Sequence, residues 1–327
     1  MVWFLKKRAS TAVPFLGGIS RCRPIGVDIS EHAIRMAQLA DNGRTTLLFA
    51  GDVRNRPSDV APGSTTWQRW AIDAICRSTS NGRFRGRKVV ASIPAGDLVI
   101  DHVKVPGAEK CNDLQKLYQA VVSKIKSKLP CQPQQAIIKY VPTEQDNLLV
   151  TACDRQIVER HLAIYEQADL VIEAMCVWYE AVANSYAKFF GRRKTDLDAV
   201  VLLVQTDNCR TNVVICRHKK VLFARSINIG PDELHDEQVI SRLVMELSQC
   251  RRQFYSMYTN AHIERLIFLC GQALAKDTCA AVARQLEMPA QVGDCLAAVQ
   301  CRDPEQVGID RRNCRLDWTT AFGLSLA

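Results

Sequence analysis

One stretch of this chain, residues 26–35, carries residue types suited to holding a phosphate group and a magnesium ion. It reads Gly-Val-Asp-Ile-Ser-Glu-His-Ala-Ile-Arg, with Asp28 at the end of a strand-like run. A glycine lets backbone amides approach a phosphate, and an aspartate orders Mg²⁺ and its waters. Phosphate binding is therefore a chemistry to consider for this stretch, which also contains Ser30, His32 and Arg35; their roles follow from the resemblance described below.

Metal-centred and nucleophilic chemistry have weaker support. The six histidines are isolated, and none has the spacing of metal ligands. The 14 cysteines include no Cys-x-x-Cys pair, which is unlike a zinc ribbon or knuckle. Glu233 and His235 do not accompany a serine in a nucleophile elbow. We therefore predict no catalytic residue and no metal site. We interpret the cysteines as thiols of a reduced cytosolic protein, with disulfides as the alternative.

The composition is that of a globular protein with a basic surface. The chain has 327 residues, of which 47% are hydrophobic and 24% are charged, and its formal net charge is +9; the mixture is ordinary for a folded domain. A basic surface favours anionic partners such as nucleic acid or acidic lipid headgroups, and a simply solvated basic surface is the alternative.

The N-terminal tip combines apolar and basic residues. Its apolar residues precede its basic ones, which is the reverse of a secretory signal, and no window of the sequence is long and apolar enough to span a bilayer. We therefore expect a cytoplasmic protein, peripheral to the inner membrane. The expected membrane contact consists of Trp3, Phe4, Leu5, Lys6, Lys7 and Arg8; a frayed terminus is the alternative.

The hydrophobic pattern predicts alternating strands and helices. Strands are expected at 24–29, 33–40, 45–50, 87–94, 98–105, 134–141, 147–153, 169–175, 198–205, 211–217, 220–227 and 264–269. Helices are expected at 64–79, 108–129, 154–168, 236–257, 272–286 and 317–326, with one more ending near residue 190. Each half therefore opens with a three-strand meander followed by helices, which indicates a duplicated α/β architecture.

Several longer stretches resemble the PilM family of type IV pilus assembly proteins, within the actin-like ATPases. They are VASIP at 90–94, IDHVKVP at 100–106, LLVT at 148–151, DRQIVERHL at 154–162, SINIG at 226–230 and ELSQCRRQFY at 246–255. Their order and spacing extend the resemblance over residues 24–326. It implies an α/β fold of the actin-like (ASKHA) type, a duplicated ribonuclease-H-like fold with an inserted 1C subdomain, as in FtsA, and a reduced or missing 2B subdomain.

The resemblance also implies a domain plan and a partner. The expected parts are an N-terminal tail at 1–23, subdomain 1A at 24–97, subdomain 1C at 98–166, the second part of 1A at 167–197, and subdomain 2A with a truncated 2B at 198–327. The implied partner is an inner-membrane pilus assembly protein of the PilN type, whose cytosolic tail would bind between 1A and 1C. Self-association is an open option, and nucleic acid is not an expected partner.

The nucleotide loops depart from the pattern of the family. In the first loop, Ser30 stands for a glycine and Arg35 for a lysine. In the second loop, Gln205 stands for the aspartate and Asp207 for the glycine. A carboxylate facing a phosphate about 4 Å away is repelled by roughly 4 kcal/mol at an effective dielectric of 20. An outward-pointing Asp207 in a rearranged site is the alternative. The nucleotide-site candidates are Asp28, Ser30, His32, Arg35, Gln205, Asp207, Asn208, Gly271 and Gln272.

These departures lead to three functional hypotheses. The first is a scaffold of a type IV pilus or type II secretion-like assembly platform, a degenerate ATPase without a cofactor. The second is an active switch of the same machinery, in which ATP with Mg²⁺ closes the cleft. The third is a nucleic-acid-binding, competence-related protein, although no nucleic-acid recognition fold is evident. We favour the scaffold.

Overall fold

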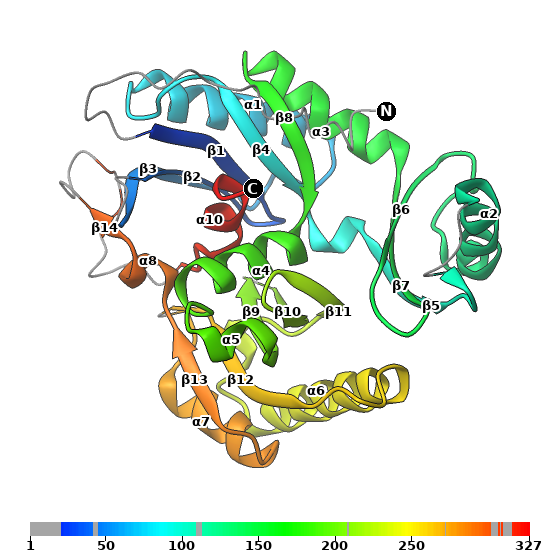
Figure 1. Cartoon of the computed structure of the whole chain (residues 1–327). Helices are drawn as coiled ribbons and strands as arrows, with labels where there is room; N and C mark the ends of the chain where they lie inside the picture. The colour runs from blue at the N-terminus through cyan, green and yellow to red at the C-terminus, as the bar shows by residue number, and fades with distance from the viewer. Residues whose placement is uncertain are drawn as a thin grey trace. The chain divides into compact units, whose positions relative to one another are not determined.

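The computed structural model of the chain describes residues 21–41, 45–108, 113–207, 209–271, 273–301, 307, 309 and 316–327. The chain forms two compact units (Figure 1). The first takes its residues from Met1–Pro94, Arg160–Ser185 and Asp294–Ala327, and the second from Ala95–Glu159 and Tyr186–Gly293. The helices α3 (Arg155–Gln167) and α4 (Trp178–Phe189) each contribute residues to both units.

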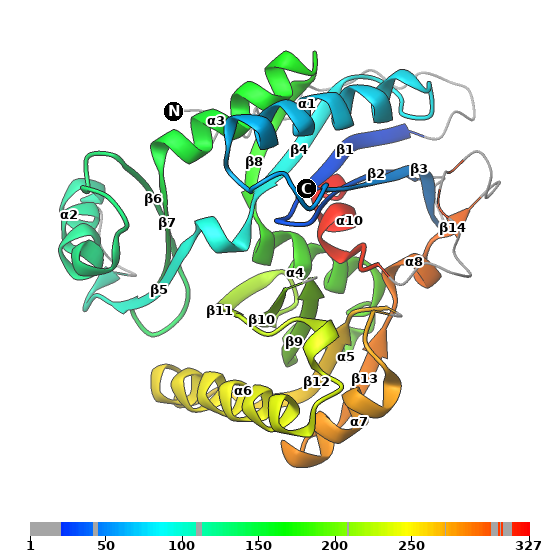
Figure 2. The ribbon, with the colours of Figure 1, turned by 180° about the vertical axis from the view of Figure 1, so that it is seen from behind.

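The first unit is built on a six-stranded sheet in the order β14-β3-β2-β1-β4-β8. The strands are β1 (Arg21–Ile29), β2 (Ala33–Asp41), β3 (Thr46–Asn55), β4 (Lys88–Ile93), β8 (Val171–Val177) and β14 (Gln300–Cys301). The first three form the expected antiparallel meander, and β4 and β8 run parallel to β1. Helix α1 (Thr65–Ser80) lies along one face and α10 (Thr319–Ser325) along the other (Figures 1 and 2).

Helix α10 packs against the first sheet through backbone contacts. A Cβ atom on Gly26 of β1 would lie 2.0 Å from the carbonyl oxygen of Ala321. The Ser325 hydroxyl donates to the carbonyl of Pro24 at 2.8 Å and accepts the amide of Leu39 at 3.0 Å. The sequence prediction grouped residues 317–326 with the second half of the chain; these contacts assign the helix to the first unit.

The second unit contains a five-stranded sheet in the order β11-β10-β9-β12-β13. The strands are β9 (Val200–Asp207), β10 (Arg210–Arg217), β11 (Lys220–Ile227), β12 (Ile263–Leu269) and β13 (Ala290–Gly293). Helices α5 (Lys194–Asp198), α6 (Glu237–Met257) and α7 (Lys276–Gln285) accompany them. The strand order and directions repeat those of β3-β2-β1-β4-β8, so the expected duplication of an α/β unit is confirmed.

The stretch between β11 and α6 is short and fully described. Residues 228–236 hold a single 3-10 turn, η4 (Pro231–Glu233), before Asp236 caps α6 by accepting the amide of Gln238 at 2.8 Å. No further subdomain is inserted between these two elements. This agrees with the expected reduction of 2B.

A separate three-stranded sheet in the order β5-β7-β6 belongs to the second unit. Its strands are β5 (Val99–Lys104), β6 (Ala136–Pro142) and β7 (Asn147–Asp154), and α2 (Leu114–Ile125) followed by η3 (Lys126–Lys128) packs on it. We call these elements the insertion sheet; they fall in the range predicted for 1C. The subdomain boundaries themselves remain predictions.

Several short elements were not predicted. They are α5, α8 (Cys295–Ala298), β13 and β14, each too brief to carry a hydrophobic period. The predicted helix 108–129 is shorter in the structure, because Asp113 caps α2 and accepts the amides of Gln115 and Lys116. Within the described residues, no helix combines the length and apolar character needed to cross a membrane.

Candidate functional site

The first candidate loop follows β1, where Asp28 lies opposite Arg35 of β2. An Arg35 Nη1 atom lies 3.4 Å from a carboxylate oxygen of Asp28, and the Ser92 hydroxyl donates to the other oxygen at 3.3 Å. The Arg35 side chain is only 3% exposed. The guanidinium therefore already offsets the charge of Asp28, the role that a bound cation would have here.

Ser30 closes the turn between β1 and β2 with its side chain. Its buried hydroxyl accepts the amides of His32 at 3.4 Å and Ala33 at 3.2 Å, and it lies 3.1 Å from the carbonyl of Ala33, to which it donates. The Ser30 amide donates to the same carbonyl at 2.8 Å. Three amides of the predicted phosphate loop, those of Ser30, His32 and Ala33, are thus hydrogen-bonded within the turn.

Tyr165 is a buried neighbour of this loop that the sequence did not indicate. It lies in α3, and its hydroxyl has no hydrogen-bond partner among the described residues. Burial, with a further contribution from the Asp28 carboxylate, raises the pKa of Tyr165 well above its ordinary value. Tyr165 therefore remains a neutral phenol. Its helical position gave no signal that would separate it from an ordinary core aromatic.

The second candidate loop lies at the end of β9 in the second unit. The buried Gln205 amide accepts a hydrogen bond from Asn212 Nδ2 at 2.7 Å, and its own Nε2 donates to the carbonyl of Thr206 at 3.1 Å. Asn212 faces Gln205 across the β9–β10 pair. Asp207 is half-buried at the end of the strand, and Asn208 lies outside the described residues. A neutral amide pair thus stands where the family pattern has a metal-side carboxylate.

Gly271 follows β12 and adopts a φ of 55°, a conformation that favours glycine. Its amide lies 3.4 Å from the carbonyl of Gly293 at the end of β13, to which it donates. This contact ties two neighbouring strand ends of the second sheet. Gln272, the other predicted residue here, lies outside the described residues. The predicted membrane contact, Trp3 to Arg8, also lies outside the described residues.

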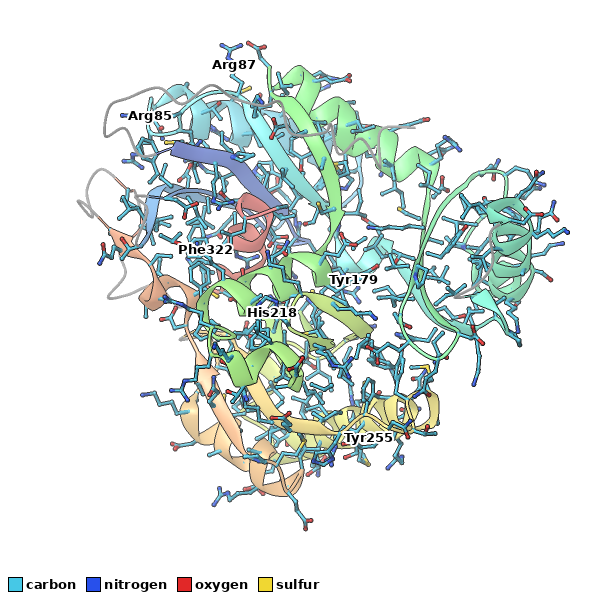
Figure 3. The ribbon with its side chains drawn as sticks, viewed as in Figure 1. Arg85, Arg87, Tyr179, His218, Tyr255 and Phe322 are labelled. Carbon is cyan, nitrogen blue, oxygen red and sulfur yellow. The ribbon has the colours of Figure 1, made fainter. Side chains whose placement is uncertain are left out.

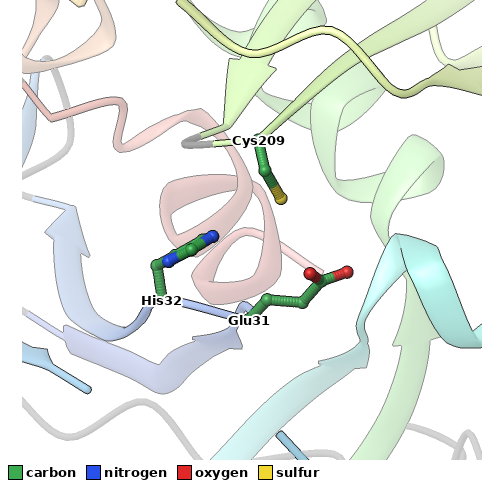
Figure 4. A group of neighbouring side chains, drawn as sticks. All are labelled: Glu31, His32 and Cys209. Carbon is green, nitrogen blue, oxygen red and sulfur yellow. The ribbon is translucent and has the colours of Figure 1, made fainter. Parts of the chain in front are cut away.

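Figure 4 draws Glu31 and His32, which follow β1, together with Cys209, which follows Asn208. Glu31 and His32 belong to the first unit and Cys209 to the second. Because each unit is described by itself, no metal site is assigned to these three residues. The predicted nucleotide residues are divided in the same way, with Asp28 and Ser30 in one unit and Gln205 and Asp207 in the other.

Two histidines are structural. His102 of β5 stacks on Phe223 with ring centroids 4.2 Å apart, and its Nε2 accepts the amide of Ala224 at 3.2 Å. His161 packs edge-on against Trp67 at 5.5 Å. Burial lowers the pKa of each histidine to about 4. Both are therefore neutral at physiological pH.

Three basic residues around the start of β4, which are Arg85, Arg87 and Lys88, each contact a neighbouring side chain; Figure 3 labels the first two. The guanidinium of Arg85 lies 4.7 Å from the centre of the Phe49 ring, and Arg87 pairs with Asp169. Lys88 pairs with Glu173 at 2.5 Å. These contacts favour the solvated basic surface over a nucleic-acid interface at this loop.

The insertion sheet is anchored to the five-stranded sheet of its own unit. The Thr143 hydroxyl lies 2.7 Å from the hydroxyl of Tyr258, which follows α6, and Asn147 Nδ2 donates to the carbonyl of Met257 at 3.1 Å. Between them, Glu144 forms ion pairs with Arg217 and Lys220 of the β10–β11 hairpin. The β6–β7 turn is therefore held by buried and charged contacts.

Both outer strands of the insertion sheet, β5 and β6, pair only with β7 among the described residues, and β6 is the edge of interest here. β7 lies in the centre and β6 forms an outer edge. The side chains of 137–141 are all half-buried, and β6 ends at a proline, which weakens further strand pairing at that point. Main-chain groups on such an edge are the usual acceptors of an added peptide strand.

The comparisons with known proteins concern the fold of this chain. No family model matches the chain, and no curated protein matches it. The topology just described is that of the actin-like ATPase fold: a Bacteroides thetaiotaomicron protein with this fold is similar over 85% of this chain and 92% of its own, with 7% identity and a TM-score of 0.51.

A second similarity is stronger. A chain of the PilM-PilN type IV pilus biogenesis complex is similar over 93% of this chain and 98% of its own, with a TM-score of 0.71 and 18% identity. The similarity to the EpsL cytoplasmic domain of the Vibrio cholerae type II secretion system is weaker, with a TM-score of 0.47 and 12% identity over 80% of this chain and 93% of its own. The predicted actin-like fold is confirmed, in a form close to that of the pilus complex.

Proposed function

We propose that this chain is a scaffold of a type IV pilus or type II secretion-like assembly platform. In this proposal it stays in the cytoplasm at the inner membrane, binds the cytosolic tail of a PilN-type inner-membrane protein, and does not turn over ATP. The observation that carries the proposal is the fold similarity to a chain of the PilM-PilN complex across nearly the full length of both chains. Because the similarity covers 93% of this chain and 98% of the other, we assign the same assembly role to this chain in the proposal.

The hydrogen bonds of the first loop support the absence of ATP turnover. Ser30 satisfies two turn amides, and Arg35 offsets the charge of Asp28. A phosphate and Mg²⁺ would have to displace both sets of contacts before gaining their own. Each rearranged hydrogen bond costs about 1 kcal/mol, and the buried ion pair costs more.

The second loop supports the same conclusion independently. Gln205 cannot supply the negative charge that holds a magnesium ion, and its amide is already bonded to Asn212. The short link at 228–236 also leaves no inserted subdomain to enclose an adenine ring from that side. We therefore propose a degenerate nucleotide site without a cofactor.

The insertion sheet is the proposed binding surface for the tail. It has no cluster of catalytic residue types, and its β6 edge offers main-chain groups to an extended peptide. Such a peptide gains main-chain hydrogen bonds from the edge, and alternate side chains supply specificity. Because β6 does not include any nucleotide-loop residue, tail binding should not require ATP.

A pull-down with the intact chain tests this function. Candidate cytosolic tails of inner-membrane assembly proteins are immobilised, with a scrambled tail as the control, and retention is compared with and without Mg-ATP. Bound complexes are then cross-linked and mapped. Equal retention in both conditions, with cross-links at 98–166, is expected. Cross-links confined to 198–327 would contradict the proposed surface, and strict ATP dependence would favour the switch hypothesis.

A further inference from the structure

Leu114, the first residue of α2, is exposed although it lies on the side of the helix that is buried elsewhere. The buried residues of this side are Leu117, Val121 and Ile125, which pack on one face of the insertion sheet (Figures 1 and 2). With about 100° between successive residues, Leu114 lies within about 20° of both Val121 and Ile125 around the helix axis. Its side chain is nevertheless 70% exposed. The first turn of α2 therefore extends beyond the part of the insertion sheet that covers the rest of this side.

This first turn lies beside β6. The Tyr140 hydroxyl of β6 donates to the carbonyl of Leu114 at 3.4 Å, and the Tyr140 ring packs against the apolar cluster under α2. The other end of the helix lies toward β5, since Lys128 of η3 pairs with Asp101 of β5 at 2.7 Å. Because β5 and β6 are the two outer strands of the sheet, α2 crosses it from one edge to the other, and its first turn reaches the β6 edge.

Tyr118 enlarges the uncovered apolar surface. It lies four residues after Leu114, on the same side of the helix, and is 39% exposed. We call Leu114 and Tyr118 the α2 overhang. Adjoining exposed apolar side chains of this size mark interaction sites. The opposite edge of the sheet differs, because His102 of β5 accepts the amide of Ala224 in β11 at 3.2 Å. The overhang therefore adjoins the edge that the five-stranded sheet does not contact in this way.

We propose that the β6 edge and the α2 overhang form one peptide-binding surface, which takes an extended segment as a fourth strand of the insertion sheet. The inference rests on the proposed function, because the occupant is the cytosolic tail of the inner-membrane partner, and it adds the chemistry that the tail must carry. A strand beside β6 would lie under the first turn of α2 and bury Leu114 and Tyr118. The edge supplies main-chain hydrogen bonds, and the helix supplies contacts for alternate side chains.

The overhang predicts a sequence pattern in the tail. Same-face residues of a strand are two apart, or about 6.8 Å, and residues four apart on a helix are separated by a rise of about 6 Å. Two apolar residues separated by one residue of any type therefore match Leu114 and Tyr118. A helical tail would instead carry apolar residues three or four apart, and it would not use the main-chain groups of β6.

Calorimetric titration of the full chain with a synthetic cytosolic tail of the candidate inner-membrane partner tests this surface. We expect Leu114→Ser with Tyr118→Ser to weaken binding about 30-fold, since two apolar side chains then lose the burial that the tail provides. Circular dichroism and the unfolding midpoint should not change, because both side chains are exposed in the free chain. Serine at either of the two apolar positions of the tail should weaken binding to the unchanged chain more than to this variant.

The matched control removes two exposed apolar side chains elsewhere in the same unit. Leu197 and Met245 are 47% and 64% exposed, and Leu197→Ser with Met245→Ser should keep the Kd within about twofold of the unchanged chain. Equal losses for the two pairs of substitutions would overturn the proposal. An unchanged affinity of the overhang variant would also overturn it and would leave the proposed function standing, whereas a tail that does not bind the unchanged chain would overturn both.

N-methylation of the tail tests strand pairing separately. The main-chain groups of alternate residues in an edge strand point toward its neighbour, so methyl groups on one alternate set of amides should abolish binding, and those on the other set should change the Kd less than about threefold. Equal effects of the two sets would contradict a fourth strand. The tail should slow hydrogen exchange over 136–142 and not over 99–104, and protection of 99–104 alone would place it at β5 and overturn the proposal.

Discussion

The Ser30 hydroxyl, the Arg35 guanidinium and the Gln205 amide each form hydrogen bonds or ion pairs inside their own loop or sheet. A nucleotide site needs the opposite arrangement, with amides and carboxylates held ready for a ligand. These three residues could be identified from the sequence because their types differ from those that the family pattern has at the same positions. Their partners, Ser92 and Asn212, could not be predicted, since cross-strand contacts depend on register.

Nucleotide affinity is the first prediction at this scale. We expect Mg-ATP to bind no tighter than about 1 mM, which corresponds to roughly −4 kcal/mol, because the loop groups must first leave their present partners. Calorimetric titration of the purified chain with Mg-ATP measures this directly, with ADP as a second ligand. An isotherm in the micromolar range would contradict the degenerate site, and so would ATP-dependent protection of 26–35 from hydrogen exchange.

The buried His161 gives a pH-dependent prediction. The unfolded chain takes up a proton as pH falls through about 6.5, whereas burial lowers the folded pKa to about 4. The unfolded state therefore binds more protons in this window, and the free energy of unfolding falls as pH drops from about 6.5 to about 4. The contribution of His161 is on the order of 3 kcal/mol, and it is fully present above pH 6.5.

The test compares denaturant unfolding at several pH values. His161→Gln should reduce the loss of stability between pH 6.5 and 4, because it removes one differential protonation. His102 titrates in the same window, so part of the loss should remain. His262→Gln, at an exposed position, serves as the substitution control. Identical profiles for His161→Gln and the unchanged chain would show that burial of this ring does not alter its protonation.

At the scale of elements, α10 completes the first unit by close backbone packing. A Cβ atom on Gly323 would lie 1.8 Å from the carbonyl oxygen of Ala181 in α4. We expect Gly323→Ala to destabilise the chain by about 3 kcal/mol, because backbone atoms must move apart to admit the methyl group. Ser241→Ala at an exposed position of α6 should change stability by less than about 0.5 kcal/mol. Thermal unfolding distinguishes them, and equal midpoints would contradict this packing.

A further prediction concerns the N-terminal tip, residues 1–8, which lies outside the described residues. Deleting residues 1–8 should leave the circular dichroism spectrum intact and weaken association with anionic liposomes, since each basic residue near such a surface contributes about 1 kcal/mol. If the full chain and the shortened chain co-sediment equally with the liposomes, residues 1–8 do not contribute to membrane association.

The sequence predicted the helices and strands themselves better than it predicted which of them pack together. The two meanders and helices α1 and α6 were evident because their periods are long and regular. Elements such as β13 and α5 span only four and five residues, which is too short for periodicity to identify. The sequence pattern predicted a helix at 317–326. Its place on the first sheet depends on the close backbone contacts of Gly26 and Gly323, which no local pattern reveals.

At the scale of the whole chain, the two units repeat one strand order, and an insertion sheet is attached to the second of them. A chain of the pilus complex is similar to this arrangement over 93% of this chain, with a TM-score of 0.71. The order of motifs along the sequence was enough to predict the fold, because the meander and the following strands recur in each half. The anchoring of the insertion sheet by Thr143, Glu144 and Asn147 was not predicted, since these residues lie in a turn without a recognisable motif.

The central claim is that the chain binds a membrane-protein tail without using ATP. The most direct measurement is calorimetric titration of the intact chain with a synthetic cytosolic tail of the candidate inner-membrane partner, in the presence and absence of Mg-ATP. We predict one binding isotherm with the same Kd in both conditions. Two results would contradict this claim. One is binding that appears only with Mg-ATP. The other is a Kd that changes tenfold or more when Mg-ATP is added, which corresponds to about 1.4 kcal/mol.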